Sequence, residues 1–371
     1  MKIETIGFPV IHNFPGDVRE FTPDLFSYLK KFPVKKMLLE KGYGERMGFS
    51  ENDYLMIDDR IFFKNETEVY ESDLMITLKN PDLEKLEMMK NGSIIFTMIH
   101  YETRPNCVDL LNRKNIRSYS MDSVVDDYGN RMFVDYFGTA FNGCEKAFEV
   151  MKDIRKDFLN PKRKPLVVTI LGAGGVGQSC VKSVEVLSDR EFLKENIPGA
   201  IPQVLTRSIT NNEEILTAEL RRTDLLVDAT KRPDSSKYII RNKMLGELPE
   251  EAIILDLTAD RYDTSAEPPM VRAFEGTVKG SPESMVIYPE DPRYEMVPDF
   301  VDTTHRRITV SCDAWPSINP AKSLKLYENM IKDYLNVIFT KDIEDISEES
   351  DNIFERGLAR STLKFFFGNR K

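Results

Sequence analysis

The 371-residue sequence has few of the residues that build metal sites, disulfide frameworks or membrane spans. It contains three histidines and four cysteines, without a CxxC pair or another closely spaced ligand set. Scattered cysteines of this kind are typical of reduced thiols, and they argue against a bound metal. No apolar run reaches transmembrane length, and the first residues lack the apolar core of a secretory signal. We therefore expect a cytoplasmic, metal-free protein that does not span a membrane.

Positive charge is also in deficit, because 61 acidic residues outnumber 51 lysines and arginines and leave a net charge of -10. Nucleic acids and anionic membrane surfaces attract basic proteins, so neither is expected as a partner. Hydrophobic residues make up 41% of the chain and charged residues 30%, which is enough for a substantial core and a solvated surface. A chain of this length is expected to form two domains.

The most informative stretch is residues 166–177, which read LVVTILGAGGVG. A β-branched run predicts a strand, the glycines follow at once, and residues 178–187 predict a helix. This is the context that a G-x-G-x-x-G dinucleotide fingerprint requires, and a plain glycine turn is the alternative. The first glycine permits a tight turn, the second lets backbone approach a pyrophosphate, and the third lets helix pack on strand. The cofactor-binding residues expected here are Gly172, Gly174, Gly175, Val176 and Gly177.

The choice of cofactor is predicted from the end of the next strand, at Thr206, Arg207 and Ser208. NAD sites usually place an acid here to bind the ribose 2′-hydroxyl, whereas an arginine accommodates a 2′-phosphate. Because the acid is absent and Arg207 is present, we expect NADP, with NAD as the alternative. Thr230 and Asp313, which follow later strands, are expected to contribute further cofactor contacts.

Strands and helices alternate along the chain, as in parallel α/β sheets. We expect two Rossmann-like parallel-sheet domains around a cleft. The substrate domain is predicted to be discontinuous, over residues 1–139 and 310–371, and the dinucleotide-binding domain to cover 140–309. Long helices are expected at 145–158 and from residue 320, with an irregular stretch at 119–131 and one helix at 351–366. The predicted strands are residues 2–10, 34–39, 74–78, 93–98, 166–171, 201–206, 225–229, 253–257, 285–287 and 308–312.

Several charged residues follow predicted strands, at the sheet edge where open parallel sheets bind ligands. Lys79 and His100 are suited to proton transfer on an amine, imine or carbonyl that undergoes hydride transfer. Arg19 and Arg131 match the geometry of a substrate carboxylate. Asp260 follows a late strand of the second domain and is expected to face the cleft. Taken singly, each also fits an ordinary role, such as a solvated lysine, a core histidine, a surface salt bridge or a helix cap.

Together these segments resemble the superfamily that holds alanine dehydrogenase, the N-terminal part of proton-translocating transhydrogenase, carboxyethylornithine synthase and lysine-forming saccharopine dehydrogenase. The resemblance runs from the N-terminus to near residue 340. Residues 127–131, 141–143 and 310–317 are most similar to saccharopine dehydrogenase. The segments that show the resemblance are the turn at 13–19 with Thr22-Pro23, and residues 78–81, 96–100, 127–131, 141–143 and 310–317.

The resemblance implies roles for the candidate residues. Arg19 and Arg131 would bind substrate carboxylates, Lys79 and His100 would act as acid and base, Asp122 would lie near the amine, and Asp260 beside the nicotinamide. Two positions depart from the family pattern. The first is Asn80, which replaces the glutamate that commonly follows the catalytic lysine, so the identity of the substrate is left open. Residues 206–208 are closer to the NADP-using carboxyethylornithine synthase.

The expected function is an NAD(P)-dependent dehydrogenase that acts on a CH–NH or CH–NH2 group of an amino acid. A saccharopine- or opine-type condensation of an amino acid with a 2-oxo acid, or its reverse, is preferred. Oxidative deamination as in alanine dehydrogenase is the first alternative. A non-catalytic nucleotide-binding sensor or structural protein is the second. The expected partners are these small molecules, and a homo-oligomer is left open.

Overall fold

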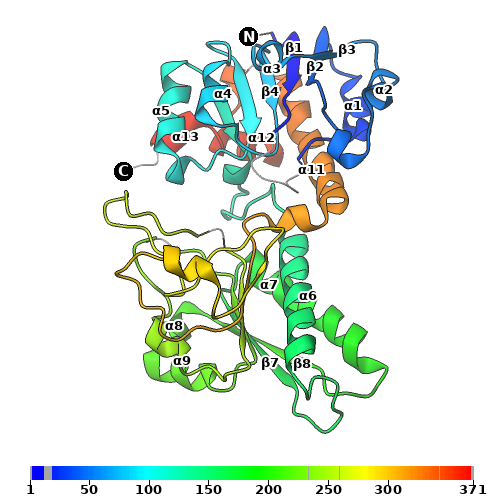
Figure 1. Ribbon diagram of the computed structural model, residues 1–371. Coiled ribbons are helices and arrows are strands. Elements are labelled where there is room, and N and C mark those ends of the chain that lie inside the picture. The colour runs from blue at the N-terminus through cyan, green and yellow to red at the C-terminus, as the bar shows by residue number, and fades with distance from the viewer. Residues whose placement is uncertain (1, 12–18, 233, 259, 342, 369–371) are drawn as a thin grey trace. The chain divides into compact units, whose positions relative to one another are not determined.

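The computed structural model describes residues 2–11, 19–232, 234–258, 260–341 and 343–368. The chain divides into two compact units, of which unit 1 is Met1–Asp135 with Pro320–Lys371 and unit 2 is Tyr136–Asn319. In Figure 1, unit 1 runs from blue to cyan and returns in orange and red, and unit 2 runs from green through yellow to orange. Unit 1 is therefore discontinuous in sequence.

Unit 1 is built on a six-stranded sheet with the order β3-β2-β1-β4-β5-β6, in which every neighbouring pair is parallel. The strand order reverses direction between β1 and β4, so the segments that leave these two strands diverge and open a ligand-binding position at the carboxyl edge. The strands are β1 (Thr5–Phe8), β2 (Lys36–Glu40), β3 (Ile61–Lys64), β4 (Leu74–Ile76), β5 (Ile94–Thr97) and β6 (Arg117–Ser120).

Helices cover both faces of this sheet, because alternate side chains of a strand point to opposite faces. Ile94 and Phe96 of β5 join a core with α1 and α11, whereas Ile95 joins a second core with α5 and α13. Burial on both faces explains why these strands are apolar throughout. The helices are α1 (Pro23–Leu29), α2 (Glu51–Leu55), α3 (Glu66–Tyr70), α4 (Leu83–Glu87), α5 (Pro105–Arg113), α11 (Pro320–Thr340), α12 (Ile353–Arg360) and α13 (Leu363–Gly368).

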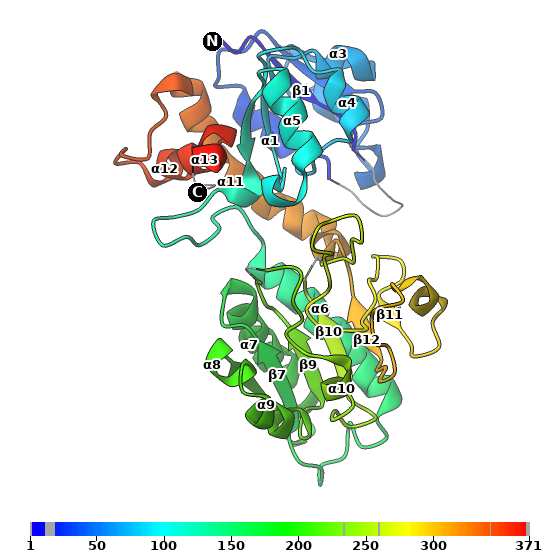
Figure 2. The same ribbon diagram turned by 90° about the vertical axis from the view of Figure 1, so that its left-hand side faces the viewer.

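Unit 2 contains a second six-stranded sheet, with the order β11-β12-β10-β9-β7-β8, whose only antiparallel pair among the described strands is β11 with β12. Figure 2 shows β7, β9, β10 and β12 side by side. The strands are β7 (Leu166–Leu171), β8 (Ala200–Leu205), β9 (Leu225–Asp228), β10 (Ile253–Asp256), β11 (Val286–Ile287) and β12 (Thr309–Ser311). The helices are α6 (Tyr136–Ile154), α7 (Gly175–Ser188), α8 (Arg207–Thr210), α9 (Glu213–Leu220) and α10 (Asn242–Leu245).

The two sheets confirm the predicted fold class. The unit boundaries at 135/136 and 319/320 differ from the predicted 139/140 and 309/310. The first difference arises because α6 is one continuous helix that begins at Tyr136. The second arises because β12 pairs with β10 inside the unit 2 sheet. No helix among the described residues is both long enough and apolar enough to cross a membrane.

Helix α6 corrects the predicted start at residue 145. Residues 137–143, which lay outside the predicted helix, form its first turns. A Cβ atom on Gly143 would lie 2.4 Å from Leu257 Cδ2, so this glycine permits close packing of the helix on the sheet. Helix α7 likewise begins at Gly175 rather than at residue 178, so the last glycines of the fingerprint are helical.

Three further segments differ from the prediction. The stretch at 119–131, predicted to be irregular, begins inside β6, which is short and polar and so lacks the apolar signal of a strand. The helix predicted at 351–366 is split into α12 and α13, because the backbone turns at Ser361. The interval 188–200, predicted as a loop, contains a π-helical turn over Asp189–Leu193.

Candidate functional site

The candidate residues of unit 1 emerge at one edge of its sheet. Lys79 follows β4, His100 follows β5 and Asp122 follows β6, and these three strands are consecutive neighbours. Because the strands are parallel, their carboxyl ends lie side by side. The turn predicted at 13–17 lies outside the described residues, whereas Arg19 is described and half-buried. The sheet therefore collects acid/base candidates at the edge where a substrate would bind.

Asp122 holds the His100 ring. His100 Nδ1 lies 3.3 Å from Asp122 Oδ2, and the His100 backbone N–H donates to Asp122 Oδ1 at 3.1 Å. The hydroxyl of Ser120 donates to the same Oδ1 at 2.7 Å and accepts from the Ile99 N–H at 3.1 Å. The Asp122 side chain is 5% exposed and that of His100 is 42% exposed. A proton on Nδ1 directed at the carboxylate leaves Nε2 as the free acceptor of the neutral ring.

The backbone at His100 is left-handed, with φ 57°, which is uncommon for a residue other than glycine. This conformation is stabilised by the contacts of both the His100 N–H and its ring with Asp122. A strained backbone of this kind persists only where surrounding contacts hold the residue in place, and it is found most often at functional sites. Sequence reasoning placed Asp122 near a substrate amine and missed its contact with the imidazole.

The surroundings of His100 favour a neutral ring, mainly because the ring is desolvated. Desolvation lowers the pKa of His100, Asp122 opposes this shift, and Arg104 and Arg131 lower the pKa further, while Glu102 raises it slightly. The lowered pKa means that Nε2 is unprotonated at neutral pH and can accept a proton. Arg131 therefore lies close enough to His100 to influence its charge.

Arg19 and Arg131 also act on one common group, the phenol of Tyr327 on α11. Burial raises the pKa of Tyr327, and both arginines partly offset that rise. Tyr327 is buried and stacks on Phe133, with ring centroids 5.3 Å apart. The guanidinium groups of Arg19 and Arg131 thus both act electrostatically on the Tyr327 phenol. Such a pair is suited to binding carboxylates.

The segment directly after Arg19 is fixed by side chains distant in sequence. The Phe21 N–H donates to Tyr43 Oη at 2.8 Å, and Tyr54 Oη donates to the Phe21 carbonyl at 2.9 Å. The Glu328 carboxylate of α11 accepts from the Thr22 N–H, and its Oε2 accepts from the Thr22 hydroxyl at 2.9 Å. These partners had no signal in the local sequence, and they limit the freedom of the backbone that leads from Arg19.

Lys79 is half-buried, and its neighbour Asn80 is only 5% exposed. The Asn80 amide donates to the Pro81 carbonyl at 3.0 Å and to Cys107 Sγ at 3.5 Å. Its Oδ1 has no hydrogen-bond partner among the residues that the structure describes. The residue that departs from the family pattern is therefore a packed, neutral side chain beside Lys79.

In unit 2, the glycine loop has the geometry that a dinucleotide needs. Gly172 has φ 105°, and a Cβ atom there would lie 2.5 Å from the Ala229 carbonyl oxygen. A Cβ atom on Gly177 would lie 1.9 Å from the Gly172 carbonyl oxygen, whereas one on Gly174 would meet nothing within 4 Å. The turn at Gly172, the open approach at Gly174 and the close packing at Gly177 thus follow one another in the predicted order. Gly174 precedes α7, and the first N–H groups of a helix have no acceptor within the helix, so they can bind an anion.

Aspartates end β9, which neighbours β7, and β10, which is the next strand of the sheet. Asp228 of β9 and Asp256 of β10 are register partners, and both are buried. Asp228 Oδ1 accepts from the Thr230 N–H at 3.1 Å and from its hydroxyl at 2.6 Å. Asp256 Oδ1 accepts in the same way from Thr258, at 2.9 Å and 2.8 Å, and its Oδ2 accepts from Arg272. The predicted contact residue Thr230 is therefore held by a carboxylate at the sheet edge.

The pairing of two buried carboxylates predicts a specific pH dependence of stability. Desolvation and the neighbouring Asp256 raise the pKa of Asp228 from 3.8 to about 7. Because the folded protein then binds this proton more tightly than the unfolded chain, the free energy of unfolding falls as the pH rises from about 4 to about 7. The titration of Asp228 contributes a loss of unfolding free energy on the order of 4 kcal/mol.

Asp228→Asn is expected to remove that part of the pH dependence, since the amide still accepts from Thr230 and carries no charge. Urea denaturation of wild type and variant at several pH values measures the difference. Equal slopes of unfolding free energy against pH in the two proteins would contradict the assignment.

Asp260, predicted beside the nicotinamide, is paired in the structure. Its Oδ2 accepts from Arg232 Nη2 at 2.6 Å, and the Asp260 side chain is 33% exposed. Arg232 is 6% exposed and also donates to the carbonyls of Val271 at 2.6 Å and Lys237 at 2.7 Å. Sequence reasoning missed Arg232, which lies in a loop without a motif. The pair holds the Asp260 carboxylate in place while leaving part of it accessible.

The other predicted cofactor residues lie at strand ends of the same sheet. Thr206 caps α8 directly after β8, and its hydroxyl lies 2.9 Å from that of Ser208. Arg207 is exposed and donates to the Lys231 carbonyl at 3.4 Å. Asp313 follows β12 and pairs with Lys279 at 2.8 Å. The end of β8 thus presents hydroxyl groups and a cation, without an acid.

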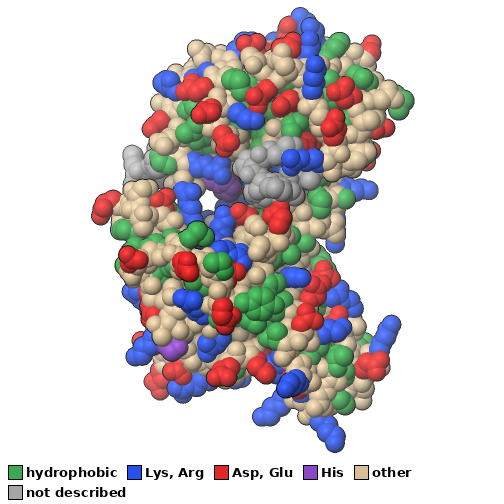
Figure 3. Space-filling model, in the orientation of Figure 1, with side chains coloured by type: hydrophobic (Ala, Val, Ile, Leu, Met, Phe, Trp, Pro, Cys, Tyr) green, Lys and Arg blue, Asp and Glu red, His purple; other side chains and the backbone are tan. Residues whose placement is uncertain are grey.

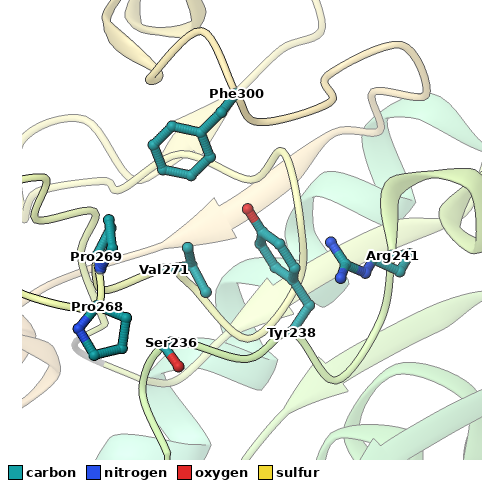
Figure 4. Close-up of a pocket in the computed structure, with 7 residues that line it drawn as sticks. All are labelled: Ser236, Tyr238, Arg241, Pro268, Pro269, Val271 and Phe300. Atoms are coloured by element: carbon teal, nitrogen blue, oxygen red, sulfur yellow. The ribbon is translucent and has the colours of Figure 1, made fainter.

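A cavity of about 360 Å³ lies elsewhere in unit 2, and none of the predicted site residues lines it. Figure 4 shows Tyr238 upright beside Arg241, with its oxygen toward the side of Phe300. The Arg241 guanidinium lies 4.5 Å from the centroid of the Tyr238 ring. The remaining lining residues are Ser236, Pro268, Pro269 and Val271.

On the face of unit 1 seen in Figure 3, acidic and basic side chains are intermixed. Within the described part of the chain, no three His, Cys, Asp or Glu side chains gather in a metal-binding arrangement. The four cysteines are buried and form no disulfide.

Comparison with known proteins gives one family and several relatives. Residues 21–136 match the family "Alanine dehydrogenase/PNT, N-terminal domain". An alanine dehydrogenase of Methanococcus maripaludis is 22% identical over 246 residues, which cover 61% of this chain and 64% of that protein. An alanine dehydrogenase of Bacillus subtilis is 19% identical over 250 residues, which cover 61% and 63%. The match therefore spans less than two thirds of the length of these relatives.

Solved structures share the fold over most of the chain. An L-alanine dehydrogenase superposes with a TM-score of 0.69 at 14% identity and covers 96% of this chain and 94% of its own. The transhydrogenase from Sinorhizobium meliloti gives a TM-score of 0.60 at 11% identity, with coverages of 90% and 94%. Together, the family match, the curated relatives and the shared fold confirm the resemblance to the superfamily of alanine dehydrogenase and transhydrogenase that the sequence motifs predicted.

Proposed function

We propose that the protein is a nicotinamide-dependent dehydrogenase that forms or breaks a C–N bond of an amino acid with a 2-oxo acid. The observation that supports this most strongly is the buried Asp122 carboxylate on the His100 ring, with Arg131 nearby. Asp122 orients an imidazole that can exchange a proton with a substrate nitrogen. Two arginines near one point of unit 1 favour a product with two carboxylates. The named relatives favour simple deamination of alanine as the second candidate.

The residues of unit 2 fit a dinucleotide. The open space at Gly174 would admit a pyrophosphate, and the first N–H groups of α7 would bind it. A bound nicotinamide cofactor would supply hydride chemistry that amino-acid side chains cannot supply. Asp260, held by Arg232, would orient an amide or an amine through its accessible oxygen.

The residues of unit 1 would bind the substrate and move its protons. Arg19 and Arg131 would bind carboxylates through paired N–H groups. His100 Nε2 would accept a proton from the amine or return it, and Asp122 would stabilise the resulting imidazolium. Lys79 would donate a hydrogen bond or a proton to the carbonyl oxygen of the 2-oxo acid.

We further propose that NADP(H) is preferred over NAD(H), because Arg207 and two hydroxyls replace the acid at the end of β8. Arg207→Ala is expected to weaken NADPH binding by about 10- to 100-fold and to leave NADH binding unchanged, since it removes one charge-assisted contact. Isothermal titration with each cofactor measures this. Arg221→Ala, at another exposed arginine of unit 2, is the matched control. An equal loss of affinity for NADPH and NADH in Arg207→Ala would contradict the preference for NADP(H).

The reaction itself is tested by the absorbance of reduced nicotinamide after mixing the protein with pairs of amines and 2-oxo acids. We expect the reduced cofactor to be oxidised only when both an amino acid and a 2-oxo acid are present. Oxidation with ammonium and pyruvate alone would support the deamination candidate. Tight cofactor binding with no oxidation by any pair would contradict a dehydrogenase and favour a nucleotide sensor.

A further inference from the structure

The C-terminal segment contacts the strand that leads to Asp122. The Ser361 carbonyl accepts from the Ser120 N–H at 2.9 Å and from Tyr101 Oη at 3.1 Å. Ser120 is the residue whose hydroxyl binds Asp122, and Tyr101 directly follows His100. Ser120 and Ser361 have no exposed surface, and Tyr101 is 1% exposed. The Ser361 carbonyl thus binds the backbone just before Asp122 and the side chain of the residue just after His100.

The same segment holds the hairpin that ends at Arg131. Within this hairpin, Val125 pairs with Arg131 in an antiparallel bridge. Asp127, near its tip, accepts from Arg356 Nε at 2.9 Å and Nη2 at 2.6 Å, and from Arg360 Nη2 at 2.8 Å. Arg360 Nη1 also donates to the Val125 carbonyl at 3.3 Å, directly across the bridge from Arg131. Two arginines of α12 therefore fix the hairpin from its tip to its base.

Helix α12 approaches this hairpin closely and is itself anchored. A Cβ atom on Gly357 would lie 3.0 Å from Val124 Cγ1 and 3.3 Å from Met132 Sδ, so a side chain there would separate helix and hairpin. Glu355, 1% exposed, accepts from Lys341 Nζ at 2.7 Å and from the Ser350 hydroxyl at 2.6 Å. These contacts tie the start of α12 to the end of α11.

We propose that α12 is a positioning element for the substrate, in which Arg356 and Arg360 set the place of Arg131 relative to His100. The inference rests on the proposed function, because it assigns Arg131 to a substrate carboxylate. Neither arginine touches the substrate in this account. Their removal should loosen the hairpin, move Arg131 away, and weaken carboxylate binding without removing the proton carrier.

The test is a double variant, Arg356→Gln with Arg360→Gln, compared with Arg113→Gln at an exposed arginine of α5. The double variant is expected to raise KM for the substrate pair by about 10-fold or more, with kcat changed less than about 3-fold, because uniform binding is lost. The control variant Arg113→Gln should change neither KM nor kcat. A lower kcat at unchanged KM would overturn the proposal.

A second readout does not need turnover. NMR titration of the imidazoles is simple because the chain has three histidines, and His100→Gln identifies the signal. Arg131 lowers the pKa of His100, so its displacement should raise that pKa in the double variant and in Asp127→Asn. An unchanged His100 pKa in both variants would overturn the proposal. A raised pKa in a protein that turns over no substrate would support the positioning role and contradict only the proposed reaction.

Discussion

Replacing His100 by glutamine is expected to lower kcat by about 100- to 10,000-fold, the usual contribution of a positioned acid/base group. Glutamine can still donate a hydrogen bond to Asp122, so the buried carboxylate keeps a partner and the fold should be retained. Cofactor affinity should stay within about 2-fold of wild type, because the predicted cofactor residues all belong to unit 2. Steady-state kinetics and titration with NADPH measure the two quantities.

Two further variants serve as a control for His100→Gln and as a test of its partner Asp122. His305→Gln changes an exposed histidine of unit 2 and should leave turnover unchanged. Asp122→Asn keeps the shape of the pair but removes the charge that stabilises an imidazolium, so kcat should fall while the cofactor still binds. Turnover that survives both changes at His100 and Asp122 would show that another group moves the proton.

The second large effect concerns the glycine loop. Gly177→Ala places a Cβ atom 1.9 Å from the Gly172 carbonyl oxygen, and backbone cannot move away as a flexible side chain can. The variant should lose roughly 3 kcal/mol of unfolding free energy, and it should no longer bind a dinucleotide measurably. Thermal unfolding and isothermal titration test the two parts.

Gly174→Ala is the informative partner of that variant. A Cβ atom there meets nothing within 4 Å, so Tm should stay the same. The added methyl group nevertheless occupies the space through which a pyrophosphate would approach the backbone, and affinity should fall at least about 10-fold. If Gly174→Ala bound NADPH as tightly as wild type, the loop would not be the phosphate-binding site.

Much of this architecture follows from local sequence. Apolar β-branched runs predicted the principal strands of both sheets, because strands buried on both faces are apolar throughout. The glycine fingerprint predicted a turn, an open approach and a close contact in the right order. Lys79 and His100 could be assigned to one edge because parallel strands present their carboxyl ends together. Asp122 was implied by the family resemblance alone, because the strand before it was not predicted.

The rest depends on contacts between distant residues. Glu328 binds Thr22 across 306 positions of the chain, and Arg356 binds Asp127 across 229. Neither pair has a local pattern, so the tail was predicted as a helix without a role. Gly143 lay outside the predicted helix, whereas in the structure it is a packing position of α6, because only the folded sheet shows what lies beside it.

The most direct measurement follows deuterium from reduced cofactor that is labelled at C4 of the nicotinamide. The labelled cofactor is mixed with the protein, an amino acid and a 2-oxo acid, and the product is analysed by mass spectrometry. We predict one deuterium on the carbon that becomes bonded to nitrogen, and loss of this label transfer in His100→Gln. Cofactor that binds to the Gly174 loop but never transfers its label to any amine/oxo-acid pair would contradict the account.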